Sequence, residues 1–200
     1  MMSKIYNYDK KHSHLIDFTK LLPNGKSFFT SISKDCSEIS SAVEFLIKHD
    51  AYPNVPDKDG IYPLEYAIKI NSLPFIKSLI DSNIINFQQL VKGNTYLHIA
   101  AAFTNDSKAF DFLLKTNLFD INSINDKGET PLMIACKARN LQAINLLFEN
   151  NNLDYLHCDE NGIDALNILN PFTSYKDVKQ SKEAYHKKIV SIINNHNDKY

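Results

Sequence analysis

Histidine and cysteine are the side chains of this sequence best able to bind a metal or attack a substrate. His12 and His14 lie two residues apart, and His157 directly precedes Cys158. A structural zinc site needs four such ligands, usually supplied as two closely spaced pairs. Neither pair is followed by a second pair at ligand spacing. We therefore expect no metal site and no cofactor.

Catalytic groups of other kinds are equally sparse. The stretch DKGETPLMIA (126–135) contains one glycine, Gly128, but Glu and Thr follow it instead of the Gly-Lys-Ser/Thr of a phosphate loop. No serine stands in a Gly-x-Ser-x-Gly turn. The acids Asp57, Asp126 and Asp159 are interpreted as turn formers and not as a carboxylate pair for acid–base work. We expect no enzyme activity.

Charge and hydropathy exclude several classes of partner. The net charge is −1 and the pI is about 6.6, so nothing in the bulk charge favours nucleic acid. No apolar run approaches the roughly 20 residues that span a bilayer. The N-terminus has no uninterrupted apolar segment typical of a signal peptide. Three widely spaced cysteines, Cys36, Cys136 and Cys158, indicate a reducing compartment. We expect a cytoplasmic protein that does not insert into membranes.

The glycines reveal how the chain is organised. All five are evenly spaced, with gaps of 35, 33, 35 and 34 residues: Gly25, Gly60, Gly93, Gly128 and Gly162. A fixed period of 20–50 residues is typical of repeat proteins. The sequence therefore predicts four to five repeats, numbered here one to five by these glycines.

Each repeat carries two apolar segments with helical spacing. The fourth residue after each glycine is apolar or aromatic: Phe29, Leu64, Leu97, Leu132 and Leu166. A second cluster follows at 43–47, 75–80, 109–114, 143–148 and, later than expected, 189–193. Its apolar residues recur at i, i+3 and i+4, which favours a helix. Each repeat is predicted to contain a turn, a short first helix, a break and a second helix.

Local residues indicate where these helices begin and end. Thr95 and Thr130 are predicted N-caps, while Pro63 and Pro131 fall at a first helical position, where no amide hydrogen bond is lost. DKDG (57–60), NDKG (125–128) and DENG (159–162) match type I turns, whereas LVKG (90–93) does not. Asparagines that can adopt the left-handed conformation are expected to end the helices: Asn71, Asn105 and Asn140 after first helices, and Asn83, Asn117 and Asn150 after second helices.

These segments resemble the ankyrin repeat. GNTYLHIAA (93–101) and GETPLMIA (128–135) are similar to the family motif G-x-T-P-L-H-x-A-A, and FDINSINDKG (119–128) is similar to its return loop. The resemblance covers about residues 24–195. Repeat two has Tyr62 and Glu65 where the family has Thr and His, repeat four has Met133 for His, and repeat one keeps only Gly25.

The resemblance implies an all-α solenoid of four to five helix–turn–helix repeats with hairpin-like loops. Residues 1–23, with Leu15, Phe18, Leu21 and Leu22, are expected to form an N-terminal cap helix. Residues 24–169 are the repeats, and 170–200 hold an insertion and a C-terminal capping helix, in one continuous domain. His98 would buttress Thr95, and Cys136 would be a small core residue.

The family binds proteins through the turn tips and the exposed side of the first helices. By offset from each glycine, the tip positions are Lys58, Asp59, Ile61, Val91, Lys92, Asn94, Asp126, Lys127, Glu129, Glu160, Asn161 and Ile163. The helix positions are Lys34, Asp35, Lys69, Ile70, Ala102, Phe103, Lys137 and Ala138. Ile61, Val91, Phe103 and Ile163 are expected to form an exposed apolar patch, and the lysines near them favour an acidic partner.

One asparagine matches a modification motif. Leu114, Asp120, Ile121 and Asn122 resemble the pattern that asparaginyl hydroxylases modify in ankyrin repeats. The alternative is that Asn122 only holds the return loop by hydrogen bonds.

Taken with the resemblance, these features predict a monomeric, non-enzymatic protein–protein interaction module. The chain resembles small stand-alone ankyrin proteins of intracellular bacteria, which often send them into host cells as effectors, so translocation into a host cytosol is one expectation. Large DNA viruses and AT-rich protists are the other sources that the composition allows. An alternative is a targeting or inhibitory subunit of an enzyme complex. A third is an active site in the insertion 170–188, around Tyr175, Lys176 and His186, where a polar helix is the favoured interpretation.

Overall fold

The computed structural model describes residues 17–33, 35–103, 108–170 and 181–197. By their internal contacts the residues group into two compact units, Met1–Asn86 (unit 1) and Phe87–Tyr200 (unit 2). Each unit has its own buried apolar core.

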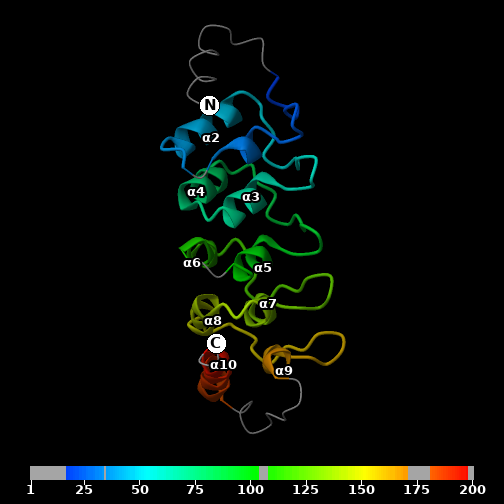
Figure 1. The fold of residues 1–200 in the computed structure, drawn as a ribbon, viewed down its shortest axis with the longest axis vertical. Coiled ribbons are helices and arrows are strands. Elements are labelled where there is room, and N and C mark those ends of the chain that lie inside the picture. The colour runs from blue at the N-terminus through cyan, green and yellow to red at the C-terminus, as the bar shows by residue number, and fades with distance from the viewer. Residues whose placement is uncertain (1–16, 34, 104–107, 171–180, 198–200) are drawn as a thin grey trace. The chain divides into compact units, whose positions relative to one another are not determined.

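Unit 1 contains repeats one and two. Its elements are the 3-10 helix η1 (Phe29–Ser31) and the α-helices α2 (Ile39–Lys48), α3 (Pro63–Lys69) and α4 (Leu73–Asp81). α4 packs against both α2 and α3, and α3 also contacts η1 (Figure 1). Phe29, Leu46, Leu64 and Phe75 are almost fully buried between these elements. The first helix of repeat one is therefore a single 3-10 turn.

Unit 2 contains repeats three to five in two columns of helices. The first helices are α5 (Tyr96–Ala101), α7 (Pro131–Lys137) and α9 (Ala165–Leu169), and the second helices are α6 (Lys108–Lys115), α8 (Leu141–Phe148) and α10 (Lys182–Asn197). α7 packs between α5 and α9, and α8 contacts α6 and α10, while the loops project to one side (Figure 1). The predicted all-α repeat fold is confirmed.

The predicted helix starts are confirmed in detail. Thr95 Oγ1 accepts from the His98 amide and Thr130 Oγ1 from the Met133 amide, both at 3.4 Å. Pro63 and Pro131 are the first residues of their helices. Each cap satisfies an amide that the first helical turn leaves without a backbone partner.

Repeat two replaces the threonine cap with a carboxylate. Tyr62 occupies the cap position and has no side-chain cap. Instead, Glu65 Oε2 accepts from the Tyr62 amide at 3.2 Å, and Glu65 Oε1 pairs with Lys69. Glu65 is buried, so Lys69 supplies the countercharge that a buried carboxylate needs. The two departures from the family motif in this repeat therefore compensate each other.

Asparagine ends several helices as expected, but two positions were predicted wrongly. Asn71, Asn83 and Asn117 are left-handed, with φ of 52°, 57° and 54°. Asn140 is not left-handed, because its side chain caps α8 by accepting from the Ala143 amide at 3.1 Å. Arg139, with φ 54°, makes the turn in its place.

Asn150 is the second exception. Its φ is not positive, and its side-chain oxygen accepts from the Asn152 amide at 2.9 Å, so it shapes a turn. The remaining predicted position, Asn105, lies outside the described residues.

The tips of the repeats are of two kinds. In repeats two, four and five the glycine amide donates to the carbonyl of Asp57, Asn125 or Asp159 at 2.9–3.0 Å, as the predicted turns require. In repeat three, Val91 and Asn94 exchange backbone hydrogen bonds as an isolated β-bridge. Lys92 and Gly93 between them both have positive φ, which is the type I′ hairpin. This explains why LVKG does not match a type I turn.

The two ends differ from their predictions. Residues 17–23 form turns instead of a helix, although Phe18 is buried against Phe28 and Phe45 at ring-centroid distances of 4.8 and 5.6 Å. Residues 1–16 of the expected cap helix, which include Leu15, lie outside the described residues. Leu21, expected on the apolar stripe, is exposed.

The final helix, α10, packs on α8 and α9 and buries Tyr185, Ile189 and Ile193. Tyr185 Oη accepts from the Leu166 amide at 3.2 Å, which satisfies a first-turn amide of α9. The helix begins at Lys182, several residues before the predicted apolar cluster. Most of the predicted insertion, including Tyr175 and Lys176, lies outside the described residues. Among the described helices none is long and apolar enough to cross a bilayer.

Candidate functional site

His98, the side chain most suggestive of catalysis, has a structural role. It is buried in α5, with Nδ1 2.7 Å from Thr95 Oγ1 and Nε2 2.8 Å from the Glu129 carbonyl oxygen. Because a carbonyl only accepts, Nε2 donates, which leaves Nδ1 to accept from the Thr95 hydroxyl. Burial lowers the pKa of His98. The neutral ring therefore ties repeat three to repeat four.

Glu129 was expected to be free at a tip, and this is wrong. The residue is 4% exposed. Its Oε2 accepts from Asn125 Nδ2 at 3.1 Å, and its Oε1 pairs with Lys137. Burial raises the pKa of Glu129, but the hydrogen bonds from Lys137 and Asn125 outweigh it and hold the pKa below its ordinary value. Asn125 Nδ2 also donates to Asn94 Oδ1 at 2.9 Å, so the network joins two neighbouring tips.

Val91 was expected in an exposed apolar patch, and this too is wrong. It is 3% exposed, and its backbone pairs with Asn94 in the β-bridge of the tip. Ile61 and Ile163 are half-buried, and Phe103 is 36% exposed. Of the four apolar positions, Phe103 is the most accessible.

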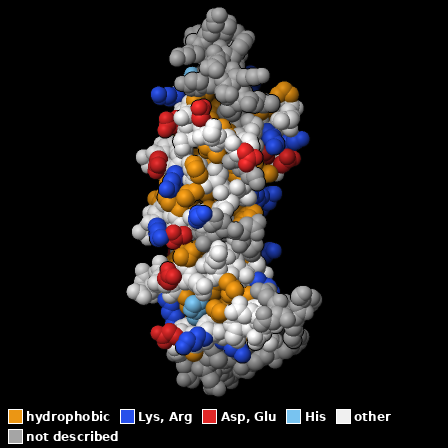
Figure 2. All heavy atoms as spheres, turned by 60° about the vertical axis from the view of Figure 1, so that its left-hand side comes forward, with side chains coloured by type: hydrophobic (Ala, Val, Ile, Leu, Met, Phe, Trp, Pro, Cys, Tyr) orange, Lys and Arg blue, Asp and Glu red, His pale blue; other side chains and the backbone are white. Residues whose placement is uncertain are grey.

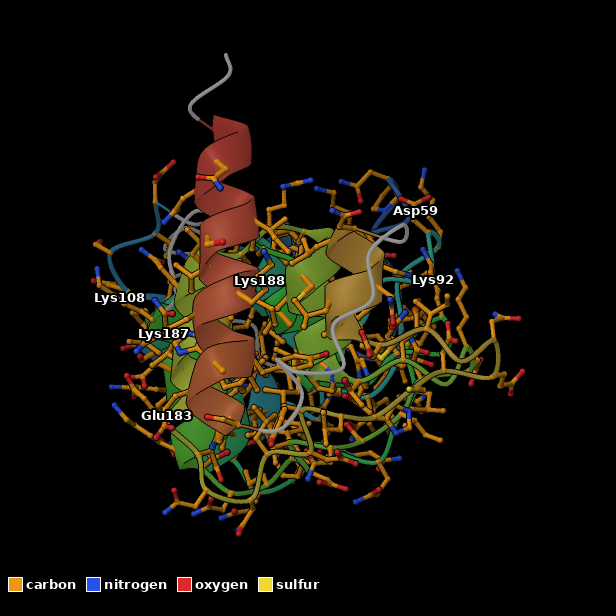
Figure 3. All side chains as sticks on the ribbon, turned by 90° about the horizontal axis from the view of Figure 1, so that it is seen from below. Asp59, Lys92, Lys108, Glu183, Lys187 and Lys188 are labelled. Carbon is orange, nitrogen blue, oxygen red and sulfur yellow. The ribbon has the colours of Figure 1, made fainter. Side chains whose placement is uncertain are left out.

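The other predicted positions are accessible wherever they are described. Those classed as exposed are Asp35, Lys58, Asp59, Lys69, Lys92, Ala102, Asp126, Lys127, Lys137, Glu160 and Asn161, and those half-buried are Ile70, Asn94 and Ala138. Lys34 lies outside the described residues. In unit 2 we call the set Lys92, Asn94, Phe103, Asp126, Lys127, Lys137, Glu160 and Ile163 the tip surface. In Figure 3, Lys92 lies on the opposite side of unit 2 from Lys108 and Lys187.

Neighbouring tips are stacked on glycines, a contact that the sequence analysis missed. The Lys58 amide donates to the Gly25 carbonyl at 2.9 Å, and the Asp126 amide to the Gly93 carbonyl at 3.0 Å. A Cβ on Gly93 would lie only 2.3 Å from Asp126 Oδ2, and one on Gly25 would lie 2.1 Å from Lys58 Cδ. Gly25 and Gly93 therefore make room for the next tip as well as allowing positive φ.

Asn122 holds a loop, as the alternative interpretation proposed. Its Nδ2 donates to the Asn152 carbonyl at 2.7 Å, and its Oδ1 accepts from the Asp154 amide at 2.8 Å. Asn54 of repeat two does the same with the Ile84 carbonyl and the Asn86 amide, at 2.6 and 2.8 Å. Hydroxylation of Asn122 stays a prediction, and a hydroxylase would have to open this loop to reach the side chain.

The remaining histidines and cysteines do not assemble. No group of three His, Cys, Asp or Glu in the described part of the chain could hold a metal ion. His157 Nε2 lies 2.8 Å from the Gly128 carbonyl oxygen, which again links two repeats. Cys136 is fully buried, and burial raises its pKa, so it is a protonated core thiol. His12 and His14 lie outside the described residues.

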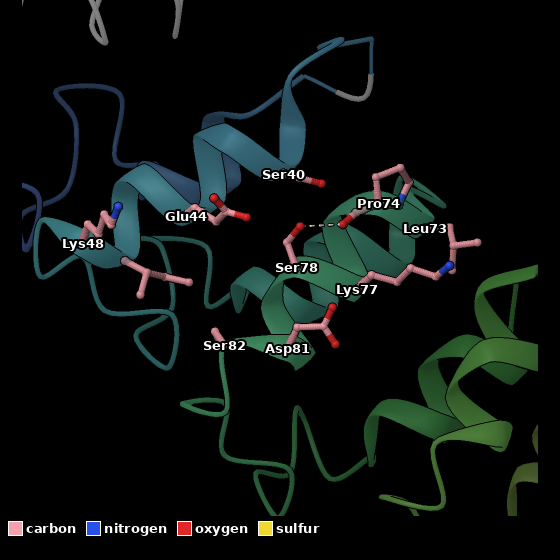
Figure 4. Close-up of a pocket in the computed structure, with 10 residues that line it drawn as sticks. Ser40, Glu44, Lys48, Leu73, Pro74, Lys77, Ser78, Asp81 and Ser82 are labelled. Atoms are coloured by element: carbon pink, nitrogen blue, oxygen red, sulfur yellow. Dashed lines mark hydrogen bonds between the residues drawn. The ribbon is translucent and has the colours of Figure 1, made fainter.

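An open groove of about 690 Å³ lies between α2 and α4 of unit 1 (Figure 4). Glu44 and Lys48 line it from α2, and Lys77 and Asp81 from α4. With two carboxylates and two lysines, the groove does not select the charge of a ligand. Figure 2, which looks onto the side of the second helices, likewise shows acidic and basic side chains interspersed in each unit.

Comparison with known proteins agrees with this architecture. A family model described as "Ankyrin repeats (3 copies)" matches residues 32–123 and 97–169. The chain belongs to the ankyrin repeat family. The fold is similar to the crystal structure of the ankyrin repeat domain of Bcl-3, a member of the IkappaB family, with a TM-score of 0.68 and 17% identity over 94% of this chain and 78% of that one.

Two curated relatives are also named as ankyrin repeat proteins. One from Fowlpox virus is 26% identical over 165 residues, which is 77% of this chain and 21% of the relative. One from Rickettsia felis is 39% identical over 82 residues, 40% of this chain and 26% of the relative. The chain thus matches about a quarter or less of each relative's length. Ankyrin repeats generally mediate protein–protein interaction, typically as non-enzymatic scaffolds.

Proposed function

We propose that the protein binds a partner protein through the tip surface of unit 2, as a non-enzymatic interaction module. The observation that carries the proposal is the separation of roles within each repeat. The motif residues Thr95, His98 and Thr130 form helix caps and links between repeats. The residues beside them on the tip surface are left accessible and differ from one repeat to the next.

The tip surface has the mixed character of a protein-binding site. It offers one accessible aromatic ring, Phe103, of the residue class that often anchors interfaces. Lys92, Lys127 and Lys137 lie on the same set of tips and first helices, so an acidic partner segment fits best and would associate faster. Asp126 and Glu160 restrict which arrangement of charges a partner can present.

The surface is held in place before any partner arrives. Hydrogen bonds fix the tip of repeat four against that of repeat three, from Asn125 Nδ2 to Asn94 Oδ1 and from the Asp126 amide to the Gly93 carbonyl. A surface with a fixed backbone loses little conformational entropy on binding.

The proposed place of action is the cytosol of a host cell, where the protein would act as an effector. The relative from a virus supports this, since a viral protein is made inside its host. Three cysteines that form no disulfide also suit a reducing compartment.

Affinity capture from host-cell lysate, read by quantitative mass spectrometry, tests the proposal. The test variant carries Phe103→Asp and Lys127→Glu. The matched control carries Leu118→Asp and Lys187→Glu, since Leu118 is 41% exposed in the return loop after α6 and Lys187 is exposed on α10. We expect proteins captured by the wild type to fall about tenfold or more with the test variant and to persist with the control.

Circular dichroism melts must first show that both variants fold. Equal loss of capture with both variants, or undiminished capture with the tip variant, would exclude the tip surface as the binding site. If the captured protein is an enzyme complex, its activity with and without the chain decides whether the module inhibits or only targets it.

A further inference from the structure

Arg139 is the one arginine of the sequence, in a chain rich in lysine. It occupies the turn between α7 and α8 with φ 54°. The matching turn between α3 and α4 uses Asn71, with φ 52°. Asparagine tolerates this conformation because its short polar side chain bonds locally, whereas arginine is disfavoured there. The choice of arginine therefore does not follow from the needs of the turn.

The Arg139 guanidinium also lacks a partner. Its Nη1 is buried, and no acceptor lies within hydrogen-bonding distance; among the side chains that the structure describes, it is the one buried polar atom in this state. A cation after a helix can bind that helix's last carbonyls, but no such bond is made here. The residue as a whole is only partly buried. A buried donor without an acceptor is costly and calls for an explanation.

The turn that holds Arg139 lies beside Phe103, a residue of the tip surface of unit 2. Asn140, next in the chain, donates through Nδ2 to the carbonyls of Ala101 and Phe103. Arg139 therefore follows α7 beside the turn in which Phe103 follows α5. The nearby Lys137 is already paired with Glu129, which leaves Arg139 as the cation of this turn with no carboxylate.

We propose that Arg139 binds a carboxylate of the partner protein, presented next to an apolar side chain that covers Phe103. The planar guanidinium matches a carboxylate with two parallel hydrogen bonds, which an ammonium cannot make. A single unneutralised cation fits a group with one negative charge. This inference rests on the proposed function and names the chemistry of the partner.

The decisive variant is Arg139→Asn, which installs the residue that unit 1 uses at this turn. Removing the buried Nη1 that has no acceptor, and relieving the left-handed backbone, should raise the melting temperature. The same change should lower capture of the partner about tenfold, and Arg139→Lys should restore capture only in part. Lys187→Asn on α10 is the control and should change neither. A melting temperature that falls in Arg139→Asn would show that Arg139 stabilises the fold, and unchanged capture would show that it does not touch the partner; either result overturns the inference.

A second readout does not depend on any partner. Because the chain has one arginine, its Nε–H gives a single resonance in a ¹⁵N correlation spectrum. We expect N-acetylglutamate N-methylamide to shift this resonance saturably and the matched glutamine compound to leave it in place. Equal shifts with both compounds, or none with either, contradict carboxylate binding. If the tip variant abolishes capture and Arg139→Asn does not, the proposed function stands and this inference falls.

Discussion

His98 shows how a single side chain can join two repeats. Its ring bonds the Thr95 hydroxyl of its own repeat and the Glu129 carbonyl of the next. The bond in which Nδ1 accepts from the Thr95 hydroxyl requires the neutral ring, whereas Nε2–H can donate to the Glu129 carbonyl in either protonation state. A chemically versatile residue is thus committed to holding adjacent repeats in register.

This commitment predicts a pH dependence of stability. Burial lowers the pKa of His98, so between its ordinary value of about 6.5 and the lower folded value the unfolded chain binds more protons. The contribution of His98 is therefore present above about pH 6.5 and is lost as the pH falls through that window. We expect His98→Gln to be less stable at neutral pH and to lose less stability on acidification, measured by urea denaturation at several pH values.

His186 provides the comparison for this measurement. It is stacked on Phe148 at a centroid distance of 4.5 Å, and burial together with Lys182 lowers its pKa as well. Because it is more exposed than His98, His186→Gln should flatten the pH dependence less. If His98→Gln loses as much stability on acidification as the wild type, the neutral buried ring is not the cause.

At the scale of the turn, neighbouring tips depend on glycine to different degrees. Gly93 and Gly162 have almost the same φ, 78° and 72°. A Cβ on Gly93 would meet Asp126, whereas a Cβ on Gly162 would have nothing within 4 Å. Gly93 lies in the hairpin tip of repeat three and Gly162 in the turn of repeat five, and of the two only Gly93 is packed against a following tip in the described structure.

Alanine at these two glycines separates backbone strain from packing. The free energy of unfolding of both variants should fall by about 1 kcal/mol, because alanine is strained at positive φ. Gly93→Ala should lose about 1–2 kcal/mol more, because the whole Asp126 side chain must move. Chemical denaturation of the two variants measures the difference, and equal losses would mean that tip stacking does not contribute.

The elements themselves could be predicted from the sequence, because their causes are local. The caps Thr95 and Thr130 and the prolines Pro63 and Pro131 act within their own helices, so spacing alone locates them. Val91 and Glu129 could not be placed this way. Val91 begins a two-residue hairpin, and the buried Glu129 is paired with Lys137, eight residues further along the chain.

The candidate site was predictable only as a list of positions. Offset from the glycines identified the accessible tips correctly for Lys92, Asp126 and Lys127. It did not point to Arg139, because that residue stands out only through its buried Nη1 without an acceptor, which spacing in the sequence does not reveal. Its position in the turn, where repeat two has Asn71, is the one hint that the sequence contained.

At the scale of the molecule, the two units differ in the number of helix pairs that bury their apolar cores. Unit 2 stacks three helix pairs, with α10 closing one end. Unit 1 has two pairs, one of which begins with a 3-10 turn. Repeat proteins need about three repeats before stacking outweighs the entropy of folding.

Separate fragments test this difference. Residues 87–200 should fold on their own and melt cooperatively, while residues 1–86 should show little helical signal. Far-ultraviolet circular dichroism during heating, with the whole chain as reference, measures both. A fragment 1–86 that melts cooperatively near the temperature of the whole chain would contradict the argument.

The asparagine side chains that bridge neighbouring return loops make it possible to measure how often two adjacent repeats separate. The amides of Asn86 and Asp154 lie on exposed loops, yet each donates to the side chain of an asparagine about thirty residues earlier. Such amides exchange with deuterium only when the hydrogen bond to the asparagine of the neighbouring loop breaks. Their exchange rates would time the opening of one repeat junction in each unit while the helices on either side remain protected.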